Sequence, residues 1–462
     1  MKRLLILFLC LFIGNTGIAA EVKILHTSDI HGRISPVEYK GKPNCGGFSR
    51  RLSFVNQIRS NSKNVLLLDS GDYFQGSLYY RLDFGKSSAK LLQEIKYDAI
   101  ALGNHEFDNG TNVLKHNIKN SKTQFLSANV HFRDKYLQKA VKPYIIKDYD
   151  GEKFLIIGVT TSKLASLSNT NNITVTNPIE EINKIIKAVK YDKLIILSHC
   201  GLEEDRSIAK NIPQIDLILG GHNHYFFNVP EYVKEVPIVQ DGEFGIRVGI
   251  IDFNQKLKHY TYKNITPEIK SDINIDEKIA KLDNHNKKVS NEILAKSEVL
   301  LIGDQTTIEH NQTNLGKLVL ISMTKAFKNT YYDGIITNSG SIRINKNFKG
   351  NISYADVLEI LPFENDIVLV EVQGNYLKKI LQRGMQNNRR YLQYYLKDKN
   401  IDNNKTYKII TNSYIVSGKD GYEEFKNSKI IKHSNTNPAK LLKQTLQEMK
   451  VLTDENLNID NL

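Results

Sequence analysis

Residues 22–32 read VKILHTSDIHG, a short apolar run followed directly by an aspartate and a histidine. The same arrangement, an expected strand followed by side chains that can bind metal, recurs at Asp69–Asp72, Leu102–Asp108, Leu197–Cys200 and Gly220–His224. Because the carboxyl ends of strands in an open α/β sheet converge on one crevice, side chains far apart in sequence can meet there. The pattern therefore predicts an α/β fold with a polar site at one edge of its sheet.

Short apolar runs alternate with helical segments from Glu21 to about Phe253. In Pro178–Lys190 the apolar side chains trace one face of a 3.6-residue period, which predicts a helix. Such alternation is typical of a layered α/β domain. The expected strands are Val22–Ser28, Asn64–Ser70, Asp98–Leu102, Gln124–Asn129, Phe154–Val159, Lys193–Ser198, Ile215–Leu219 and Ile246–Phe253.

The composition changes after about Tyr260, where lysine, aspartate, asparagine and glutamate dominate. Sparse apolar positions at helical spacing in Asp276–Lys296 predict an exposed helical connector or a peripheral helix of the first domain. A second α/β unit then follows, and we expect domains at 21–260 and 298–462, with a connector at 261–297. Its expected elements are helices Asn314–Phe327 and Asn375–Gly384 and strands Gly334–Thr337, Ile367–Val372 and Lys408–Asn412.

The first twenty residues have the features of a secretory signal peptide. Lys2 and Arg3 precede the apolar run Leu4–Ile13, and small residues close the segment at Ala20. No other segment is apolar enough to cross a membrane, so we expect a periplasmic or secreted protein. Cys45 and Cys200 would then be the remaining cysteines, and they could pair in an oxidising compartment.

The 462 residues carry a formal net charge of +13, with 63 Lys and Arg against 50 Asp and Glu. A chain of this length needs more than one hydrophobic core. The basic residues are dispersed and form no stripe interleaved with aromatics, so we expect no nucleic-acid partner. The sequence leaves the oligomeric state open.

The strand-end side chains supply mixed nitrogen and oxygen ligands, enough for two divalent ions. Each motif alone could instead be a helix cap or a turn, but their conjunction favours metal. Two adjacent ions suit an in-line displacement at phosphorus by a metal-bound water, and Mn, Zn, Co or Fe would all accept these ligands. The candidates are four histidines, two aspartates and one asparagine: His31, His199, His222, His224, Asp29, Asp72 and Asn104.

This ordered set resembles the calcineurin-like metallophosphoesterase superfamily. The longer strings Leu25–Gly32, Asn104–Asp108 and Ser127–Val130 are similar to its secreted 5′-nucleotidase family. That family includes periplasmic nucleotidase/UDP-sugar hydrolases and 2′,3′-cyclic phosphodiesterases. The resemblance implies a four-layer α/β/β/α metallophosphoesterase domain followed by a smaller α/β substrate-binding domain.

The resemblance also implies a role for each motif residue. One metal would take Asp29, His31, Asp72 and His224, and the other Asp72, Asn104, His199 and His222, so that Asp72 bridges the two. His105 would stabilise the phosphate and its leaving group, and Asp108 would orient His105. Taken alone, His105 could be a further metal ligand and Asp108 a helix cap.

Three strings of the second half resemble the family's substrate domain: Asn338–Arg343, Leu361–Asn365 and Tyr414–Tyr422. The resemblance places Phe363 and Tyr414 around the base, Asp420 on the ribose, Arg343 on the phosphate, and Asn338 as a nearby polar contact. Without the resemblance, we would expect the aromatic Phe363, which follows a proline, to lie in the core, and Gly418–Gly421 to form an ordinary turn. The sequence departs from the family at Gly303–Leu315, which lacks an arginine that relatives commonly have there; Lys317 could supply only a point charge.

We therefore expect a secreted two-metal phosphohydrolase that converts nucleoside 5′-monophosphates to nucleoside and phosphate. The same site could instead act on 2′,3′-cyclic nucleotides or UDP-sugars. A non-enzymatic alternative is a secreted nucleotide-binding or adhesion protein with a decayed site, but all seven ligand positions hold competent residues.

Overall fold

The computed structural model describes residues 21–168, 170, 172–254, 256–344, 346–386 and 391–461, and the chain forms two compact units, residues 1–282 and 283–462. Helix α9 (Ile273–Ser290) contains the boundary between them. The expected signal peptide lies outside the described residues, and the domain bounds drawn from the sequence stay a prediction.

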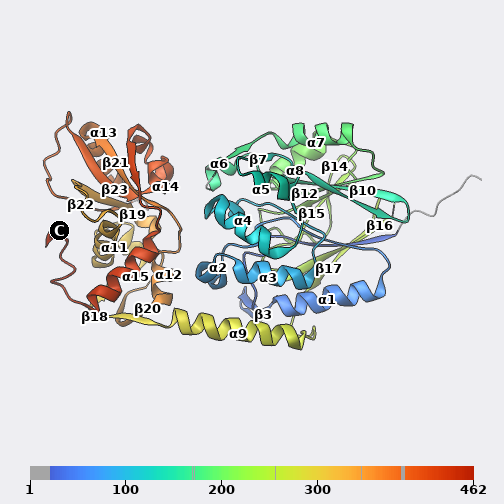
Figure 1. Cartoon of the computed structure of the whole chain (residues 1–462), viewed down its shortest axis with the longest axis horizontal. Coiled ribbons are helices and arrows are strands. Elements are labelled where there is room, and N and C mark those ends of the chain that lie inside the picture. The colour runs from blue at the N-terminus through green and yellow to red at the C-terminus, as the bar shows by residue number, and fades with distance from the viewer. Residues whose placement is uncertain are drawn as a thin grey trace, which may run out of the picture. The chain divides into compact units, whose positions relative to one another are not determined.

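Unit 1 is built on two sheets (Figure 1). A seven-stranded sheet has the order β17 (Lys256–Asn264), β16 (Arg247–Asn254), β1 (Val22–Thr27), β4 (Val65–Asp69), β5 (Ala99–Ala101), β6 (Phe125–Leu126) and β8 (Val141–Lys142). A six-stranded sheet has the order β14 (Glu231–Val233), β15 (Val236–Gln240), β13 (Leu217–Gly220), β12 (Lys193–His199), β10 (Glu152–Thr160) and β9 (Tyr144–Tyr149).

Alternate side chains of these strands point to opposite faces and so build three apolar layers. In β4, Leu66 and Leu68 join a core shared with Ile195 and Leu197 of β12, which packs the two sheets against each other. Leu67 faces the other way, into a core with the helices of the first sheet. Unit 1 therefore has the four-layer α/β/β/α arrangement that the family resemblance implies.

Helices cover the outer face of each sheet (Figure 1). The first sheet carries α1 (Phe48–Asn61), α3 (Lys86–Ile95) and α4 (Gly110–Ser121), and the second carries α7 (Pro178–Ala188) and α8 (Leu202–Asn211). Shorter elements fill the connections: α2 (Leu78–Asp83), α5 (Lys135–Ala140), α6 (Leu164–Leu167), β2 (Val37–Tyr39), β3 (Lys42–Cys45), β7 (Val130–Phe132) and β11 (Ile173–Val175).

The central strands of both sheets run parallel, and their register aligns their carboxyl ends. Thr27 at the end of β1 lies opposite Asp69 at the end of β4, and Thr160 of β10 lies opposite His199 of β12. Each sheet therefore delivers several loops to a single edge, which is the position of the site described below.

Unit 2 is the smaller α/β unit. Its five-stranded sheet has the order β22 (Leu392–Leu396), β19 (Gly334–Asn338), β23 (Thr406–Asn412), β21 (Ile367–Gln373) and β24 (Lys429–His433). A separate three-stranded sheet has the order β20 (Phe348–Ser353), β18 (Ile293–Leu301) and β25 (Val451–Leu452). Its helices are α10 (Gln305–Ile308), α11 (Asn314–Thr324), α12 (Tyr354–Ile360), α13 (Gly374–Gln386), α14 (Ser413–Val416) and α15 (Pro438–Met449).

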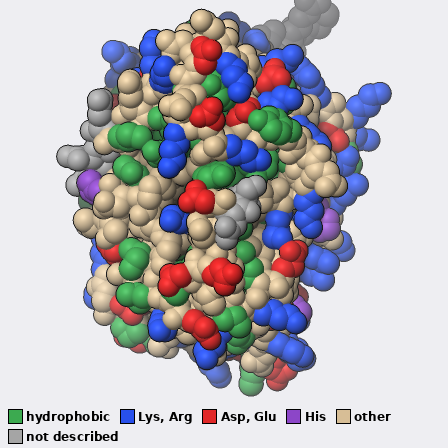
Figure 2. All heavy atoms as spheres, turned by 90° about the vertical axis from the view of Figure 1, so that its left-hand side faces the viewer, with side chains coloured by type: hydrophobic (Ala, Val, Ile, Leu, Met, Phe, Trp, Pro, Cys, Tyr) green, Lys and Arg blue, Asp and Glu red, His purple; other side chains and the backbone are tan. Residues whose placement is uncertain are grey.

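Cys45 and Cys200 are free thiols, so the pairing that an oxidising compartment would permit is not made in this structure. Within the described ranges, no helix has the length and hydropathy needed to cross a bilayer. Figure 2 shows one face of the protein, on which Lys and Arg side chains are interspersed with acidic and apolar ones rather than gathered into a single patch.

Candidate metal centre

Five loops of unit 1 bring the predicted metal ligands to the carboxyl edge of the two sheets. Asp29 and His31 follow β1, Asp72 follows β4, and Asn104 follows β5. In the second sheet, His199 ends β12, and His222 and His224 follow β13. The loops come from both sheets, so the site forms only when the sheets pack together. The structure places all seven residues there, as the strand-end pattern predicts.

Five of these residues have a left-handed backbone, which L-residues rarely adopt. Their φ angles are 52° for Asp29, 51° for His31, 53° for Asp72, 75° for His222 and 59° for His224. Such a conformation costs about 1–3 kcal/mol per residue and persists only where the surrounding structure over-determines it. Five of the seven candidate ligands therefore carry backbone strain, although other non-glycine residues of the described chain also have a positive φ.

A glycine lets two of these loops approach each other. A Cβ built on Gly103, one residue before Asn104, would lie 2.1 Å from Oδ1 of Asp72. No side chain fits there, so glycine is required for the Asp72 and Asn104 loops to meet.

The ligand atoms converge in overlapping groups. Asp29, His31 and His224 form one group, and Asp72, His199 and His222 form another, with the ligand atoms of each group within 4.8 Å of one another. Asp72 also groups with His31 and His105. Asp72 therefore lies where a bridging carboxylate is expected.

Several of these contacts join two atoms that could each bind a cation. Nε2 of His31 lies 3.2 Å from Nε2 of His224, and Nδ1 of His222 lies 2.8 Å from Oδ1 of Asn104. The buried Nε2 of His199 makes no hydrogen bond of acceptable geometry, although Oδ2 of Asp72 is 3.0 Å away. Convergent lone pairs and an orphaned buried nitrogen are what divalent cations would satisfy, and the mixed N/O donor set suits them.

The carboxylates of this cluster are buried among histidines. Asp29 and Asp72 are 0% and 1% exposed. Burial alone would raise the pKa of Asp72, but His199 and His105 outweigh burial and hold that pKa well below its usual range. Asp72 is therefore an anion, as a metal ligand must be.

Hydrogen bonds behind the imidazoles fix which nitrogen faces the cluster. Nδ1 of His31 donates to the backbone oxygen of Gln75 at 2.8 Å, and Nδ1 of His199 donates to that of Ser70 at 2.6 Å. A carbonyl can only accept, so Nδ1 carries a proton in both rings, and Nε2 is the nitrogen that would face a bound cation.

The predicted catalytic pair lies beside the cluster. Nδ1 of His105 is 2.6 Å from Oδ2 of Asp108, and its Nε2 is 4.0 Å from Oδ2 of Asp72. Ser168 donates to the other Asp108 oxygen at 2.6 Å. Burial alone would lower the pKa of His105, but Asp72 and Asp108 outweigh it and raise the pKa to about 9. His105 therefore presents a proton on its open side.

Glu106 also supports the site, although the sequence motif assigned it no role. Its buried carboxylate accepts backbone N–H groups from Gly103 at 2.7 Å, Asp72 at 2.9 Å, Tyr73 at 2.8 Å and Phe74 at 3.3 Å. Burial and the charge of Asp72 raise the pKa of Glu106 to about 7. One side chain thus ties the Asp72 loop to the Asn104 loop, and its only sequence signal is its place in the Asn104–Asp108 string.

The predicted nucleoside contacts form two groups in unit 2. In the first, Asn338 donates to Asp420 at 2.6 Å, and Tyr414 donates to the other Asp420 oxygen at 3.2 Å. In the second, the Arg343 guanidinium lies 5.7 Å from the centre of the Phe363 ring, which is 41% exposed. An aromatic exposed to this degree is available to stack on a planar ligand, in contrast to a core aromatic.

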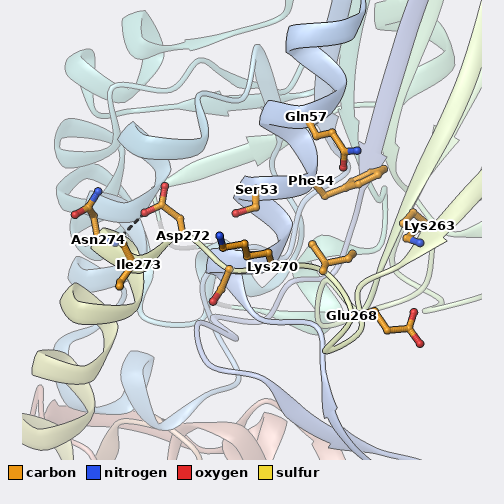
Figure 3. Close-up of a pocket in the computed structure, with 11 residues that line it drawn as sticks. Ser53, Phe54, Gln57, Lys263, Glu268, Lys270, Asp272, Ile273 and Asn274 are labelled. Carbon is orange, nitrogen blue, oxygen red and sulfur yellow. Dashed lines mark hydrogen bonds between the residues drawn. The ribbon is translucent and has the colours of Figure 1, made fainter.

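A pocket of about 720 Å³ lies elsewhere on unit 1 (Figure 3). It is lined by α1 and by the segment that leads into α9, including Phe54, Lys263, Lys270 and Asp272. None of the candidate ligands lines it, so the candidate centre rests on ligand chemistry and not on this pocket.

Comparisons with known proteins agree with this reading. The calcineurin-like phosphoesterase family matches residues 22–226, and the 5′-nucleotidase C-terminal domain family matches residues 293–395 and 385–427. The 5′-nucleotidase of Diplobatis ommata is 26% identical over 97% of this chain and 91% of its own. The trifunctional nucleotide phosphoesterase YfkN of Bacillus subtilis is 28% identical over 88% of this chain, which spans only 32% of that longer protein.

A solved structure extends the likeness to the fold. The 5′-nucleotidase precursor from Thermus thermophilus superposes with a TM-score of 0.65 at 27% identity, over 94% of this chain and 97% of its own. The two family matches and the convergent Asp and His side chains identify a divalent-metal-dependent phosphoester hydrolase. The chain belongs to the 5′-nucleotidase family, in which a calcineurin-like phosphoesterase domain precedes a 5′-nucleotidase C-terminal domain.

Proposed function

We propose that this protein is an exported 5′-nucleotidase that hydrolyses nucleoside 5′-monophosphates to nucleoside and phosphate. The observation that carries the proposal is the position of Asp72, whose carboxylate belongs to overlapping groups of ligand atoms at the edge of the two sheets. That arrangement supports two cations, one with Asp29, His31, Asp72 and His224 and the other with Asp72, Asn104, His199 and His222. Mn, Zn, Co or Fe would suit these donors.

Bound cations would lower the pKa of a water molecule and neutralise phosphate oxygens. The chain's own residues supply the rest. Asp108 holds Nδ1 of His105, so the protonated Nε2 is free to donate to a phosphate oxygen or to the leaving oxygen. Ser168 holds Asp108 in turn, which fixes the plane of the imidazole.

Unit 2 would supply recognition of the nucleoside. Phe363 and Tyr414 would stack on the base, Asp420 would accept from ribose hydroxyls, and Arg343 would face the phosphate. The exposed ring of Phe363 and the hydrogen-bonded Asp420 support this assignment. We keep 21–260 and 298–462 as the proposed domains.

The test is phosphate release by the purified, metal-loaded protein from a panel of AMP, 2′,3′-cyclic AMP and UDP-glucose. We expect the highest kcat/KM for AMP. A preference for the cyclic nucleotide or for UDP-glucose would move the protein to another specificity of the same family. Nucleotide binding without turnover of any of the three would support the non-enzymatic alternative.

A matched pair of variants separates chemistry from folding. His105→Ala should abolish most phosphate release, whereas His259→Ala, an exposed histidine on edge strand β17, should leave it unchanged. The proposed export is tested separately by the N-terminal sequence of the mature protein in the periplasmic or culture fraction, which we expect to begin near Glu21.

A further inference from the structure

His224 has a support that differs in kind from those of the other candidate ligands. Its Nδ1 lies 2.7 Å from Oε2 of Glu243, whereas Nδ1 of His31 and of His199 meets a neutral backbone oxygen. A carboxylate behind an imidazole raises its basicity as a metal ligand and fixes its orientation more strongly than a carbonyl does. The two groups of ligand atoms therefore differ in the support behind their histidines, because only one group has a histidine backed by a carboxylate.

Glu243 is itself held in place. The hydroxyl of Tyr39, at the end of strand β2, donates to Oε1 of Glu243 at 3.2 Å, which leaves Oε2 for His224. The Glu243 side chain is 16% exposed and that of His224 is 35% exposed, so solvent screens this pair only in part.

The loop that carries Glu243, residues 241–246, is tied to both ligand loops of this group. The backbone N–H of Phe244 donates to the carbonyl of Asp29 at 2.8 Å, and that of Gly242 donates to the carbonyl of Tyr225, next to His224, at 2.9 Å. Phe244 has a φ of 59°, so this loop also holds a strained residue. Glu243 is thus fixed relative to Asp29 and His224 together.

We infer that Glu243 is a positioning residue that acts through His224 and makes the cation position of Asp29, His31 and His224 bind more tightly than the position of His199 and His222. The inference rests on the proposed function, because it requires two cations. It predicts that the two cations bind with different affinities and that only one of them depends on Glu243.

The test is calorimetric titration of Mn²⁺ into the full chain stripped of metal by a chelator. In Glu243→Gln we expect one of two binding events to weaken by about 10–100-fold, the usual loss for an outer-sphere partner, and the other to stay within about threefold. Glu231→Gln is the matched control, because Glu231 pairs with Arg206 on the surface of the same unit. It should reproduce the wild-type titration.

A double-mutant cycle shows whether Glu243 acts through His224. In a His224→Ala background, adding Glu243→Gln should cause no further loss of Mn²⁺ affinity. A Glu243→Gln titration that superimposes on the wild type, equal weakening of both events, or full additivity with His224→Ala would each overturn the inference.

Two further measurements keep the outcome interpretable. If circular dichroism in chelator shows that Glu243→Gln does not fold, Glu243→Asp replaces it. The aspartate side chain is one methylene shorter, so this variant should weaken the same binding event. Wild-type Mn²⁺ affinities in Glu243→Asp would overturn the inference. A wild-type protein that binds a single Mn²⁺ would overturn the two-cation proposal instead, independently of either variant.

Discussion

Replacing Glu106 with glutamine should destabilise unit 1 far more than a change of one atom suggests. Oε2 of Glu106 accepts from Gly103 and Asp72, and Oε1 accepts from Tyr73 and Phe74. Glutamine turns one of these oxygens into an NH₂ group, which cannot accept. Two of the four buried N–H groups then lose their acceptor whichever way the amide is turned.

Each unsatisfied buried donor costs about 1–3 kcal/mol, so we expect a loss of about 2–6 kcal/mol. For a unit of this size about 1 kcal/mol moves Tm by about 2–4 °C, which makes the expected drop at least about 4 °C. Differential scanning calorimetry in chelator at pH 8, above the pKa of about 7 of Glu106, measures the loss with the carboxylate ionised and no cation contributing.

The control for this variant is Glu231→Gln, which removes a carboxylate from a partly exposed pair with Arg206. Exposed pairs contribute about 0.2–1 kcal/mol, so its Tm should move by no more than about 4 °C. If Glu106→Gln unfolds within about 1 kcal/mol of the wild type, the four amide contacts do not hold the two ligand loops together, and the reasoning fails.

Three further outcomes follow from the site. His105→Ala should lower kcat for AMP by about 10²–10⁴-fold, the usual range for a general acid, with the Mn²⁺ stoichiometry unchanged; a kcat within threefold of the wild type would contradict the role of His105. Adding Mn²⁺ to the chelated protein at about 100 times its Kd should stabilise unit 1 by about 2.7 kcal/mol per site, and an unmoved calorimetric Tm would argue against cation binding. Phe363→Ala should raise KM for AMP by about 5–150-fold, from about 1–3 kcal/mol of stacking, and leave KM for p-nitrophenyl phosphate unchanged because that substrate has no base; equal changes for both would reject the stacking role.

The central strands could be predicted from the sequence because buried parallel strands read as apolar runs. The expected strands Val22–Ser28 and Lys193–Ser198 correspond to β1 and β12 within one residue. Strand β17 (Lys256–Asn264) was not predicted. It is an edge strand whose side chains are mostly exposed, so its polar composition resembles the connector that follows it.

The ligands could be predicted for the same reason, since each follows an apolar run and sits in a short motif. The supports behind them could not. Glu243 lies on a loop far from its partner Tyr39 in sequence, with no periodicity or spacing to mark it. Glu106 is inside a motif, but its four amide partners are visible only once two loops have met.

The backbone strain explains why these supports should differ in effect. Five left-handed residues at about 1–3 kcal/mol each amount to about 5–15 kcal/mol, as large as the net stability of a typical domain. The packed core between the two sheets must offset that cost, and hydrogen bonds must stop the loops from relaxing. Removing Glu106 leaves donors buried where water cannot reach them, so stability falls. The Glu243–His224 pair is partly exposed, so we expect water to replace the lost contact and the cost to appear chiefly as weaker cation binding.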